Sequence, residues 1–427
     1  MAGLSMRSGI PLLKLPAGTM APSSQFLAQS YSSEVKARDI NLAAMKRGRG
    51  GRSSFSGDVV TVFGGNGFIG RGVANRLGKN GSQMIFPYRG DHYKMMRLKV
   101  VGDLGQVLFC PFELKDEESI RNAVKHSNIV INLIGRDMET RNFSYTDVNV
   151  NGPETIARIC KEMGVQRLVH MSSINARAEP ERAFLSRGSE WLRTKYAGEL
   201  AVRDQFPDAT IFRCSDVYGQ QDNFINRIFS ILTRNGFHGI PLYLKGNYTV
   251  KQPVHMSDVV TGIMNSLYDP EAIGQTYEAV GPERITMNEL VRYMYECTSR
   301  TPEAWNFHIT ELMLDPTAFI KAYMTSKSPF GGVEAFYQQS LDTLERMSIS
   351  DESEGYPDLT HLGVKLSTLQ QRMPWELKAR DLFSYYEYET VEEVPIVKPP
   401  KILSFHEERD LKNRGAAGLL NIIPGIN

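Results

Sequence analysis

The sequence predicts an α/β fold in which a doubly wound parallel sheet carries helices on both faces, followed by a smaller C-terminal lobe and an extension. Three observations predict this class. Short apolar runs are separated by helical stretches, the runs are continuous rather than alternating, and a glycine-rich turn joins the first run to the first helix. Continuous apolar runs are typical of strands buried on both faces, and intervening helices imply right-handed crossovers between parallel strands.

We expect strands to follow one another along the first half of the chain. The first is a run of β-branched and aromatic residues, and the second must hold Pro87 near its end because proline donates no hydrogen bond to a sheet. The expected strands lie at 59–63, 83–88, 106–110, 128–134, 167–171 and 209–212. Apolar periodicity predicts helices at 71–77, 224–232, 259–267 and 287–295.

The turn after the first strand is the strongest motif. Gly64, Gly67 and Gly70 are spaced as in Rossmann-like, dinucleotide-binding folds. Gly64 permits the tight turn, Gly67 lets a pyrophosphate approach the backbone, and Gly70 lets the helix pack close to the strand. The N–H groups at the start of the helix then face the phosphates. A glycine-rich turn without a ligand is the alternative, but the strand before it and the helix after it favour nucleotide binding.

The nucleotide should lie where the carboxyl ends of the strands meet, in a crevice formed by the loops at 64–70, 87–91, 113–116, 133–137 and 172–175. Arg89 follows the second strand, where an NAD-preferring site usually has an acidic residue. An arginine suits a 2′-phosphate through forked, charge-assisted hydrogen bonds, so we favour NADPH over NADH. An exposed loop arginine is the alternative. Glu113 and Leu114, after the third strand, would lie by the adenine.

Composition excludes several functional classes. The chain has 427 residues, a net charge of +1, 41% hydrophobic and 23% charged residues, as in an ordinary globular protein. This charge gives no reason to expect nucleic acid as a partner. The four cysteines lack the spacing of a metal site or a disulfide framework, and such thiols suit a reducing compartment. No apolar run approaches the length that crosses a bilayer, so we expect membrane association to be peripheral, through partners.

The N-terminal segment differs in composition from the rest. Residues 1–33 contain no acidic side chain, are rich in serine and carry Arg7 and Lys14, and more basic residues follow up to Arg52. This is the composition of a mitochondrial import presequence, with a disordered basic tail as the alternative. We therefore divide the chain into a presequence and basic segment (1–55), a nucleotide-binding domain (56–220), a smaller lobe (221–300) and a C-terminal extension (301–427).

The second half of the chain shows no constellation of acids, bases or metal ligands. We expect Asp258 to cap the helix that follows it rather than to act with His255. The last part holds an aromatic cluster at 383–388, a proline-rich segment at 394–400 and an apolar tail at 419–424. Such apolar residues either dock on a partner or fold back onto the body of the protein.

Several motifs together resemble the extended short-chain dehydrogenase/reductase family. They are the glycine turn, NVNG at 149–152, HMSS at 170–173, SDVYG at 215–219 and QPVHMSDVV at 252–260. Three further stretches are similar to an atypical branch of it, the NADPH-containing accessory subunits of mitochondrial respiratory complex I: GRGGRSS at 48–54, PYR at 87–89 and LIGRD at 133–137. The resemblance implies a place on the matrix side of the mitochondrial inner membrane, with other subunits of that complex as partners.

The resemblance also tests the chain for catalysis. Active members use a tyrosine as proton donor, a lysine four residues later, and a serine that holds the substrate oxygen. Ser173 matches the serine and Lys195 the lysine, but the tyrosine position holds Trp191. An indole N–H donates a hydrogen bond and does not ionise usefully, so it cannot serve as the acid or base. Tyr196 points about 100° away from Lys195 on a helix and does not replace it. A shifted alignment is the alternative.

The sequence therefore predicts a cofactor site with no catalytic residue and no metal ligand. Its candidate residues are Gly64, Asn66, Gly67, Phe68, Ile69, Arg89, Glu113, Leu114, Leu133, Ile134, Ser173 and Lys195. In an inactive protein Lys195 can still hydrogen-bond the nicotinamide ribose. Two functions follow: a non-catalytic accessory subunit of complex I in which NADPH supports assembly or stability, or a mitochondrial NADPH-dependent oxidoreductase or epimerase with an unconventional proton donor.

Overall fold

The computed structural model describes residues 48, 50–229, 239–299, 308–327, 340–381, 397–404 and 406–411. The described residues belong to one compact unit within residues 46–427. The acid-free segment at 1–33, the aromatic cluster at 383–388 and the tail at 419–424 lie outside the described residues.

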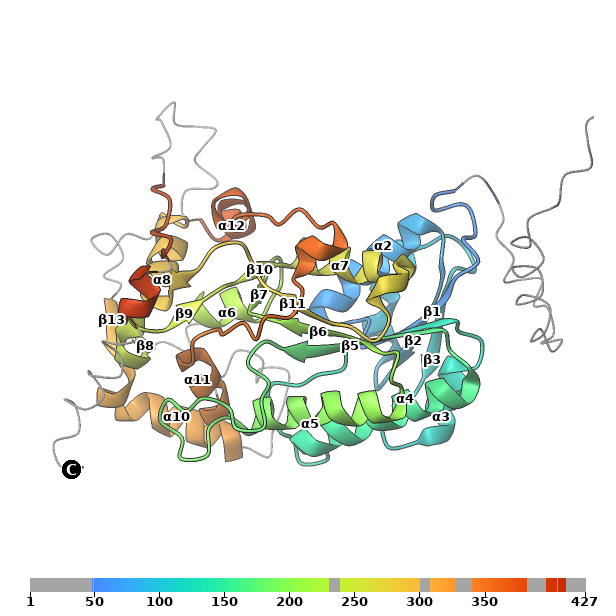
Figure 1. Cartoon of the computed structure of the whole chain (residues 1–427), viewed down its shortest axis with the longest axis horizontal. Coiled ribbons are helices and arrows are strands. Elements are labelled where there is room, and N and C mark those ends of the chain that lie inside the picture. The colour runs from blue at the N-terminus through green and yellow to red at the C-terminus, as the bar shows by residue number, and fades with distance from the viewer. Residues whose placement is uncertain are drawn as a thin grey trace, which may run out of the picture. The chain divides into compact units, whose positions relative to one another are not determined.

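A seven-stranded sheet forms the centre of this unit, in the order β11-β6-β5-β4-β1-β2-β3, and every neighbouring pair is parallel (Figure 1). The predicted doubly wound parallel sheet is therefore confirmed. The chain order reverses between β1 and β4, which is the place where such sheets bind ligands. The strands are β1 (Val59–Phe63), β2 (Gln83–Tyr88), β3 (Val107–Pro111), β4 (Ile129–Asn132), β5 (Arg167–Ser173), β6 (Thr210–Cys214) and β11 (Thr276–Ala279).

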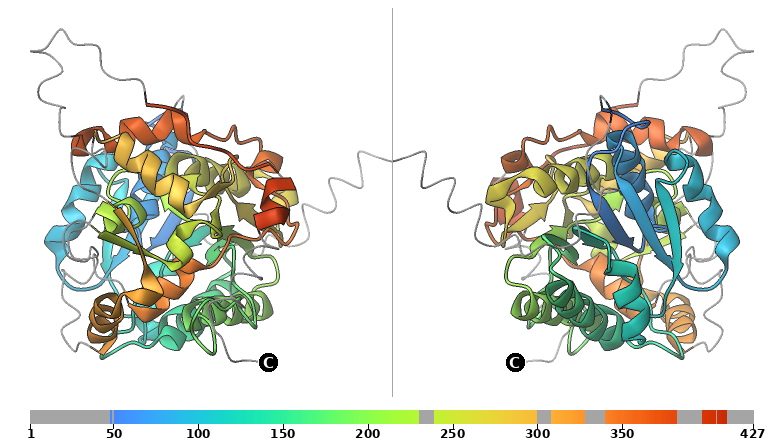
Figure 2. Two further views of the ribbon diagram at one scale, coloured as in Figure 1. Left: turned by 90° about the vertical axis from the view of Figure 1, so that its left-hand side faces the viewer. Right: turned by 90° about the vertical axis from the view of Figure 1, so that its right-hand side faces the viewer.

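Helices cover both faces of the sheet (Figures 1 and 2). One face carries α2 (Phe68–Asn80) and α7 (Met256–Tyr268), and the other carries α3 (Glu117–Val124), α4 (Gly152–Met163) and α5 (Glu190–Gln205). The residues of strand β1 are continuously apolar because both faces of the strand are buried. Val60 and Val62 join the core under α2 and α7, whereas Phe63 joins the core under α3 and α4. Apolar side chains on both faces of the strand are thus removed from water.

Shorter elements follow in the second half of the chain. Helices α6 (Phe224–Phe229), α8 (Met287–Glu296) and α12 (Leu369–Leu377) share one apolar cluster. The short strands pair as β7 (Val217–Tyr218) with β10 (Val254–His255), β9 (Val250–Lys251) with β12 (Ile285–Thr286), and β8 (Gly239–Leu242) with β13 (His308–Glu311). Two helices of the extension, α10 (Pro316–Lys327) and α11 (Leu341–Ser348), pack against each other.

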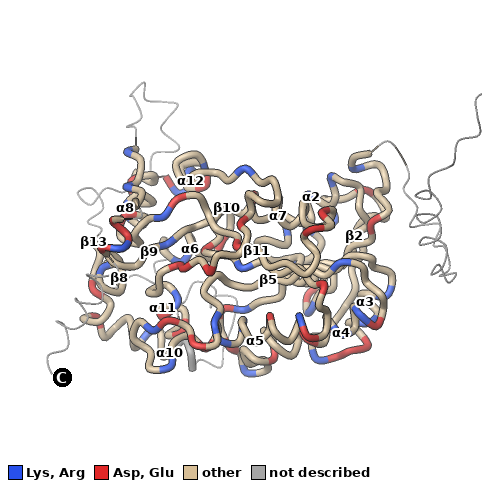
Figure 3. Tube along the Cα trace, viewed as in Figure 1, with Lys and Arg blue, Asp and Glu red and all other residues tan. Residues whose placement is uncertain are grey.

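The described part of the C-terminal extension packs onto the body. The short helix η9 (Leu359–Leu362) places Leu359 and Leu362 in the core under α7, and α12 places Met373 in the cluster with α8. Basic and acidic residues are interspersed over these elements rather than separated (Figure 3), as the small net charge suggests. Within the described residues, no helix combines the length and the apolar character needed to cross a bilayer.

The structure also differs from the sequence-based expectations. Helix α2 begins at Phe68 rather than at residue 71, and β4 ends at Asn132 rather than at residue 134. Leu133 packs against the apolar core, whereas Ile134 lines the cavity described below. Strand β11 was not predicted, since its alternating sequence TYEA does not read as a buried run. The prediction that Asp258 caps a helix is wrong.

A different residue caps that helix. His255 is the N-cap of α7, and its ring nitrogen accepts a hydrogen bond from the Ser257 N–H. Asp258 lies inside the first turn and its carboxylate reaches the C-terminal extension instead, where it accepts hydrogen bonds from the N–H and the hydroxyl of Ser367. The tertiary contact therefore takes the carboxylate away from the helix end.

Candidate functional site

The glycine turn between β1 and α2 has the geometry that its spacing predicts. Gly64 has a φ of +78°, and a Cβ atom there would lie 2.9 Å from the carbonyl oxygen of Leu133. A Cβ on Gly70 would lie 2.5 Å from the Gly64 carbonyl oxygen, which itself accepts a hydrogen bond from the Gly67 N–H at 2.9 Å. Only glycine therefore lets strand, turn and helix come this close.

The start of α2 is built to face an anion. Gly67 is its N-cap and supplies no side-chain hydrogen bond to the first turn, which contains Phe68 and Ile69. The N–H groups of a first helical turn have no partner within the helix, and the helix dipole favours negative charge there. This turn thus offers backbone donors at the switch point of the sheet.

A cavity of about 260 Å³ opens beside the turn, at the carboxyl ends of β1, β2, β3 and β4. Five of the predicted residues line it: Gly64, Asn66, Arg89, Leu114 and Ile134. Five more lining residues fall in loops that the sequence places around the crevice: Gly65, Pro87, Tyr88, Gly135 and Arg136. The sequence did not predict the remaining four, Met95, Phe112, Phe143 and Val148. Its apolar and aromatic walls suit a flat ring such as a nucleobase.

Arginine side chains surround the cavity. The guanidinium of Arg89 stacks over the ring of Phe143 at 4.8 Å, and burial together with the neighbouring Arg89 lowers the pKa of Arg136. Arg97 donates hydrogen bonds to the side chain and the carbonyl of Asn66. Burial and the charge of Arg97 also lower the pKa of Arg71.

These guanidinium groups have no acidic partner among the residues that the structure describes. Within the part of the chain that the structure describes, no carboxylate lies within 4.0 Å of Arg71, Arg89, Arg97 or Arg136. Guanidinium groups that depress one another's pKa gain from a bound anion, and phosphates accept forked hydrogen bonds from them. The crevice therefore has the charge that a multiply phosphorylated nucleotide needs.

The other predicted residues lie around the cavity or farther along the sheet edge. Glu113 is exposed and does not line the cavity. Ser173 ends β5 and is half-buried. Lys195, on α5, is buried, and its ammonium donates a hydrogen bond to the Met171 carbonyl at 3.2 Å. A Cβ on Gly135 would lie 3.5 Å from this ammonium, so Lys195 lies beside the loop that lines the cavity.

Lys195 and Trp191, which the family resemblance places at the lysine and tyrosine positions, lie near each other on α5. Burial lowers the pKa of Lys195 to about 8, against the opposing charges of Glu199 and Asp137. The Lys195 ammonium lies 5.6 Å from the centre of the Trp191 ring. The indole N–H donates to the Arg136 carbonyl at 2.8 Å, so its single polar atom is already engaged.

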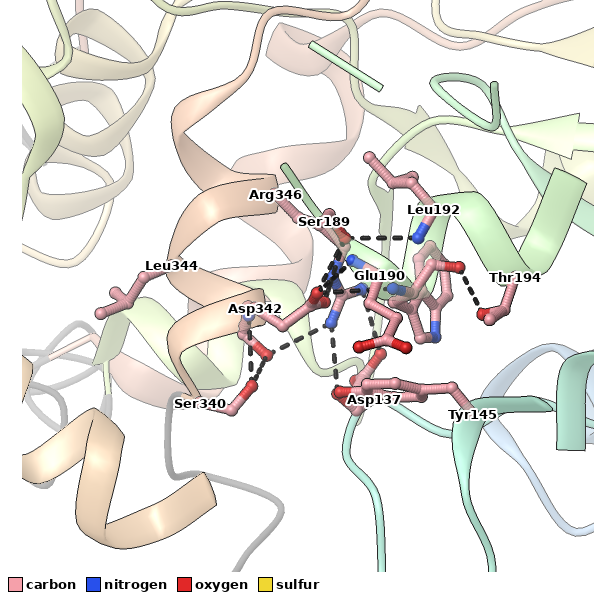
Figure 4. A network of polar contacts seen from close by, with 12 residues as sticks. Asp137, Tyr145, Ser189, Glu190, Leu192, Thr194, Ser340, Asp342, Leu344 and Arg346 are labelled. Atoms are coloured by element: carbon pink, nitrogen blue, oxygen red, sulfur yellow. Dashed lines mark hydrogen bonds and ion pairs between the residues drawn. The ribbon is translucent and has the colours of Figure 1, made fainter. Parts of the chain in front are cut away.

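A residue that the sequence reasoning missed completes this region. The guanidinium of Arg346, on α11, lies 4.1 Å from the centre of the Trp191 ring. Figure 4 shows Arg346 and Asp342 side by side on this helix. Asp342 on the same helix accepts a hydrogen bond from the backbone N–H of Trp191. Nothing in the local sequence of α11 links it to a residue so distant along the chain. Among the described residues, no group of three histidine, cysteine, aspartate or glutamate side chains could hold a metal ion.

Comparison with known proteins gives a family for this arrangement. The model of the NAD dependent epimerase/dehydratase family matches residues 60–279. The chain is 41% identical over 391 residues to NADH dehydrogenase (ubiquinone) 1 alpha subcomplex subunit 9, mitochondrial, of Mus musculus, which covers 91% of this chain and 96% of the relative. The protein of the same name from Arabidopsis thaliana is 39% identical over 304 residues, covering 70% and 72%.

Solved structures show the same fold at low identity. The UDP-glucuronic acid 4-epimerase of Bacillus cereus, in complex with UDP-glucuronic acid and NAD, has a TM-score of 0.53 at 13% identity, covering 77% of this chain and 99% of that chain. A likeness at this identity concerns the fold alone. The family match and the relatives, covered over 96% and 72% of their own length, carry the assignment of the chain to its family.

Proposed function

This chain belongs to the NAD dependent epimerase/dehydratase family, and we propose that it is a non-catalytic accessory subunit of mitochondrial NADH:ubiquinone oxidoreductase (complex I). In this proposal it binds NADPH as a structural cofactor that supports assembly or stability. It is imported into mitochondria by its N-terminal segment and lies on the matrix side of the inner membrane, held there by other subunits. Support for the partner comes from relatives that share most of their length with this chain and carry the name of that enzyme.

The observation that carries the proposal is a contrast within one crevice. Among the described residues, the arginines that line its cavity have no acidic partner, whereas Trp191, which the resemblance places at the position of the catalytic tyrosine, lies beneath Arg346. The first feature suits a nucleotide with several phosphates, and the second leaves no hydroxyl to give or take a proton at that position. A protein with both features keeps its cofactor and does not use it.

NADPH fits the residues that are present. The first-turn N–H groups of α2 would hold the pyrophosphate, and Arg89 with Arg136 would hold the 2′-phosphate. The apolar wall at Leu114 would hold the adenine, and Lys195 the nicotinamide ribose. Gly64 supports this fit because a Cβ there would close the turn against the next strand. When bound, NADPH supplies a hydride; the residues named here bind and orient it.

The free energy of NADPH binding would be large enough to matter for the stability of the fold. A ligand present at a thousand times its dissociation constant stabilises the folded state by about 4 kcal/mol. Domains of this class are stable by only ~5–15 kcal/mol, so a retained nucleotide would supply a large share. NADPH would then act as an assembly element without turning over.

The alternative is an NADPH-dependent oxidoreductase or epimerase with an unconventional proton donor. The observation in its favour is Lys195, because a buried lysine with a pKa near 8 can exchange a proton close to neutral pH. Against it, the Lys195 ammonium donates to the Met171 carbonyl, and the ring of Trp191 lies beneath the guanidinium of Arg346. We therefore rank it second.

Native size and cofactor content distinguish the two functions. We expect the protein isolated from mitochondria in mild detergent to run with a very large membrane assembly and to release NADPH only on denaturation. Recombinant Arg89→Ala and Gly67→Val chains should bind NADPH weakly, melt earlier and assemble poorly. A small soluble oligomer that oxidises NADPH with carbonyl substrates would establish the alternative. Normal stability and assembly after loss of the nucleotide would refute the structural role.

A further inference from the structure

A segment of the C-terminal extension lies along the part of the crevice that the cavity does not reach. Residues 340–354, here called the strap, comprise α11 and the chain that leaves it. The strap runs from the N-terminus of α5 to the loop after β5 and to strands β6 and β11 (Figure 1). Its side chains make ionic and hydrogen-bonded contacts at each of these places.

The first contact holds the start of α5. Asp342 accepts hydrogen bonds from the Ser189 hydroxyl at 3.0 Å and the Glu190 N–H at 2.9 Å (Figure 4). Glu345, which is fully buried, accepts three backbone N–H bonds from residues 183–185, at 2.7, 3.0 and 3.1 Å. A carboxylate at a helix N-terminus is favourable because it meets free N–H groups and the positive end of the helix dipole. The strap thereby holds the backbone from 183 to 190.

The second contact fills the space beside Trp191. Arg346 lies over the indole ring and also reaches Asp137, with Nη1 3.4 Å from Oδ1. Asp137 is further paired with Arg227 at 3.2 Å. Burial alone would raise the pKa of Asp137, but the charges of Arg346 and Arg227 hold it below its usual range. A proton donor must lie within hydrogen-bond reach of its substrate, so a substrate would need the place that Arg346 takes.

The third contact anchors the far end of the strap. Asp351 is buried, lies 3.3 Å from the Lys251 ammonium and accepts a hydrogen bond from Asn175, just after β5. Glu354 pairs with Arg177 at 2.7 Å and with the buried Arg213 of β6. The strap is therefore tied down on both sides of Trp191, by charges that find their partners in the rest of the fold.

We propose that the strap is a built-in occupant of the substrate side of the crevice, which encloses the nicotinamide half of a bound nucleotide and bars a second reactant from it. The inference rests on the proposed binding of NADPH. To release the nucleotide, the strap must leave Trp191, and this separates partly buried ion pairs that then lack compensation. Retention of the cofactor is thus kinetic: the nucleotide leaves slowly because the strap opens rarely.

The test compares the full chain with Arg346→Met, which removes the charge over Trp191. Arg158→Met is the matched control, because Arg158 pairs with Glu117 and Glu162 on α3 and α4, away from the strap. Two rates are measured on chains loaded with NADPH. One is release during a chase with NADP⁺. The other is oxidation by N-methylphenazinium, which takes a hydride from the nicotinamide ring to give NADP⁺ and the neutral dihydrophenazine.

We expect bound NADPH in the unaltered chain to react and leave slowly. Arg346→Met should speed both processes by roughly tenfold or more, tenfold being about 1.4 kcal/mol. The control should match the unaltered chain. If NADPH binds but leaves and reacts at equal rates in the unaltered chain and in Arg346→Met, the proposed role of the strap is wrong and the proposed binding of NADPH stands. If no chain binds NADPH, the proposed function and the enclosure of a nucleotide both fail.

Amide hydrogen exchange tests the strap without any nucleotide. The N–H groups at 183–185 and 190–191 should be protected in the unaltered chain, because Glu345 and Asp342 accept their hydrogen bonds. Arg346→Met should speed their exchange. Asp342→Asn, which keeps the shape of the side chain, should do the same and serves as the second variant if Arg346→Met does not fold. Unchanged exchange rates at these amides in a folded variant would show that the strap does not hold this backbone.

Discussion

The two ends of the crevice use charge in opposite ways. The nucleotide half, defined by the cavity at the ends of β1 to β4, gathers guanidinium groups that have no carboxylate within reach among the described residues. The strap half, defined by Trp191, Lys195 and residues 340–354, pairs its arginines with aspartate and glutamate side chains from the same chain. Uncompensated charge marks a place for a ligand, and compensated charge marks a place that the protein fills itself.

The difference follows from what each half would have to bind. Phosphates bring their own negative charge, so a crevice for them must leave its guanidinium groups free. A substrate pocket needs room and a proton donor, and we propose that in the strap half Arg346 takes the room and Trp191 the donor position. In that proposal the fold keeps the half that holds a cofactor and closes the half that would use it.

Loss of one charge in the strap half should have the largest effect. Arg213→Met leaves the buried carboxylate of Glu199 without its arginine and leaves Glu354 paired with Arg177 alone, and removing one member of a buried ion pair costs ~3–5 kcal/mol. We expect the free energy of unfolding in urea to fall by about that amount. Arg121→Met, at an exposed pair with Glu162, should change it by less than ~1 kcal/mol. Equal effects would mean that the strap half is not held by its charges.

Closing the glycine turn should be next in size and confined to the nucleotide half. Gly64→Ala puts a Cβ at a positive φ and against the Leu133 carbonyl, a strain of ~1–3 kcal/mol. The variant should unfold at a lower temperature, and added NADPH should no longer raise its unfolding temperature. Gly90→Ala is the matched control, since Gly90 also has a positive φ, of +83°, but a Cβ there would meet no atom within 4 Å. An NADPH response that survives Gly64→Ala would break the assignment of the turn.

The arginines should decide between the two nicotinamide nucleotides. A hydrogen bond to a charged group is worth ~1.5–3 kcal/mol, so Arg89→Ala should weaken NADPH binding by roughly tenfold to a hundredfold. Binding of NADH, which has no 2′-phosphate, should hardly change. Calorimetric titration of both nucleotides into the variant and the unaltered chain measures this. An equal loss for both would assign Arg89 to the pyrophosphate instead. Arg136→Ala, measured in the same way, shows whether the second guanidinium shares the role.

The buried lysine gives the smallest effect, as a dependence on pH. The pKa of Lys195 is lowered to about 8 in the folded protein, below its unfolded value of 10.5. Between these values the unfolded state binds more protons, so the contribution of Lys195 to stability rises with pH through this window. We expect the difference in unfolding free energy between the nucleotide-free chain and Lys195→Met to change by about 1 kcal/mol per pH unit between pH 8 and 10. A difference that stays constant with pH would mean that Lys195 is solvated.

Local patterns were enough to predict much of the nucleotide half. A buried strand, three glycines and a helix are neighbours in sequence, so their mutual geometry follows from short-range sterics, and β1, the turn and α2 formed as expected. Arg89 could be placed because the end of a strand is itself a local feature. Helical periodicity likewise puts Trp191 and Lys195 on the same face of α5, and the structure has the lysine ammonium near the indole ring.

Other features of the site had no local signal. Phe143 and Val148 join the cavity only because β4 lies beside β1, and strand β11 pairs with β6 despite an alternating sequence. Asp258 looked like a helix cap until Ser367, far along the chain, took its carboxylate.

By itself, then, the sequence determined the fold class and the geometry of the glycine turn, because strand and helix patterns and tight turns depend on residues that lie close together in the chain. The tertiary structure decided what fills the substrate side, which arginines stay free and why the pKa of Lys195 falls. Those properties depend on burial and on charges brought together from distant parts of the chain, and Coulomb energy is set by distance in space. Asp342 and Arg346 read as ordinary charges of an amphipathic helix until the fold places them over Trp191.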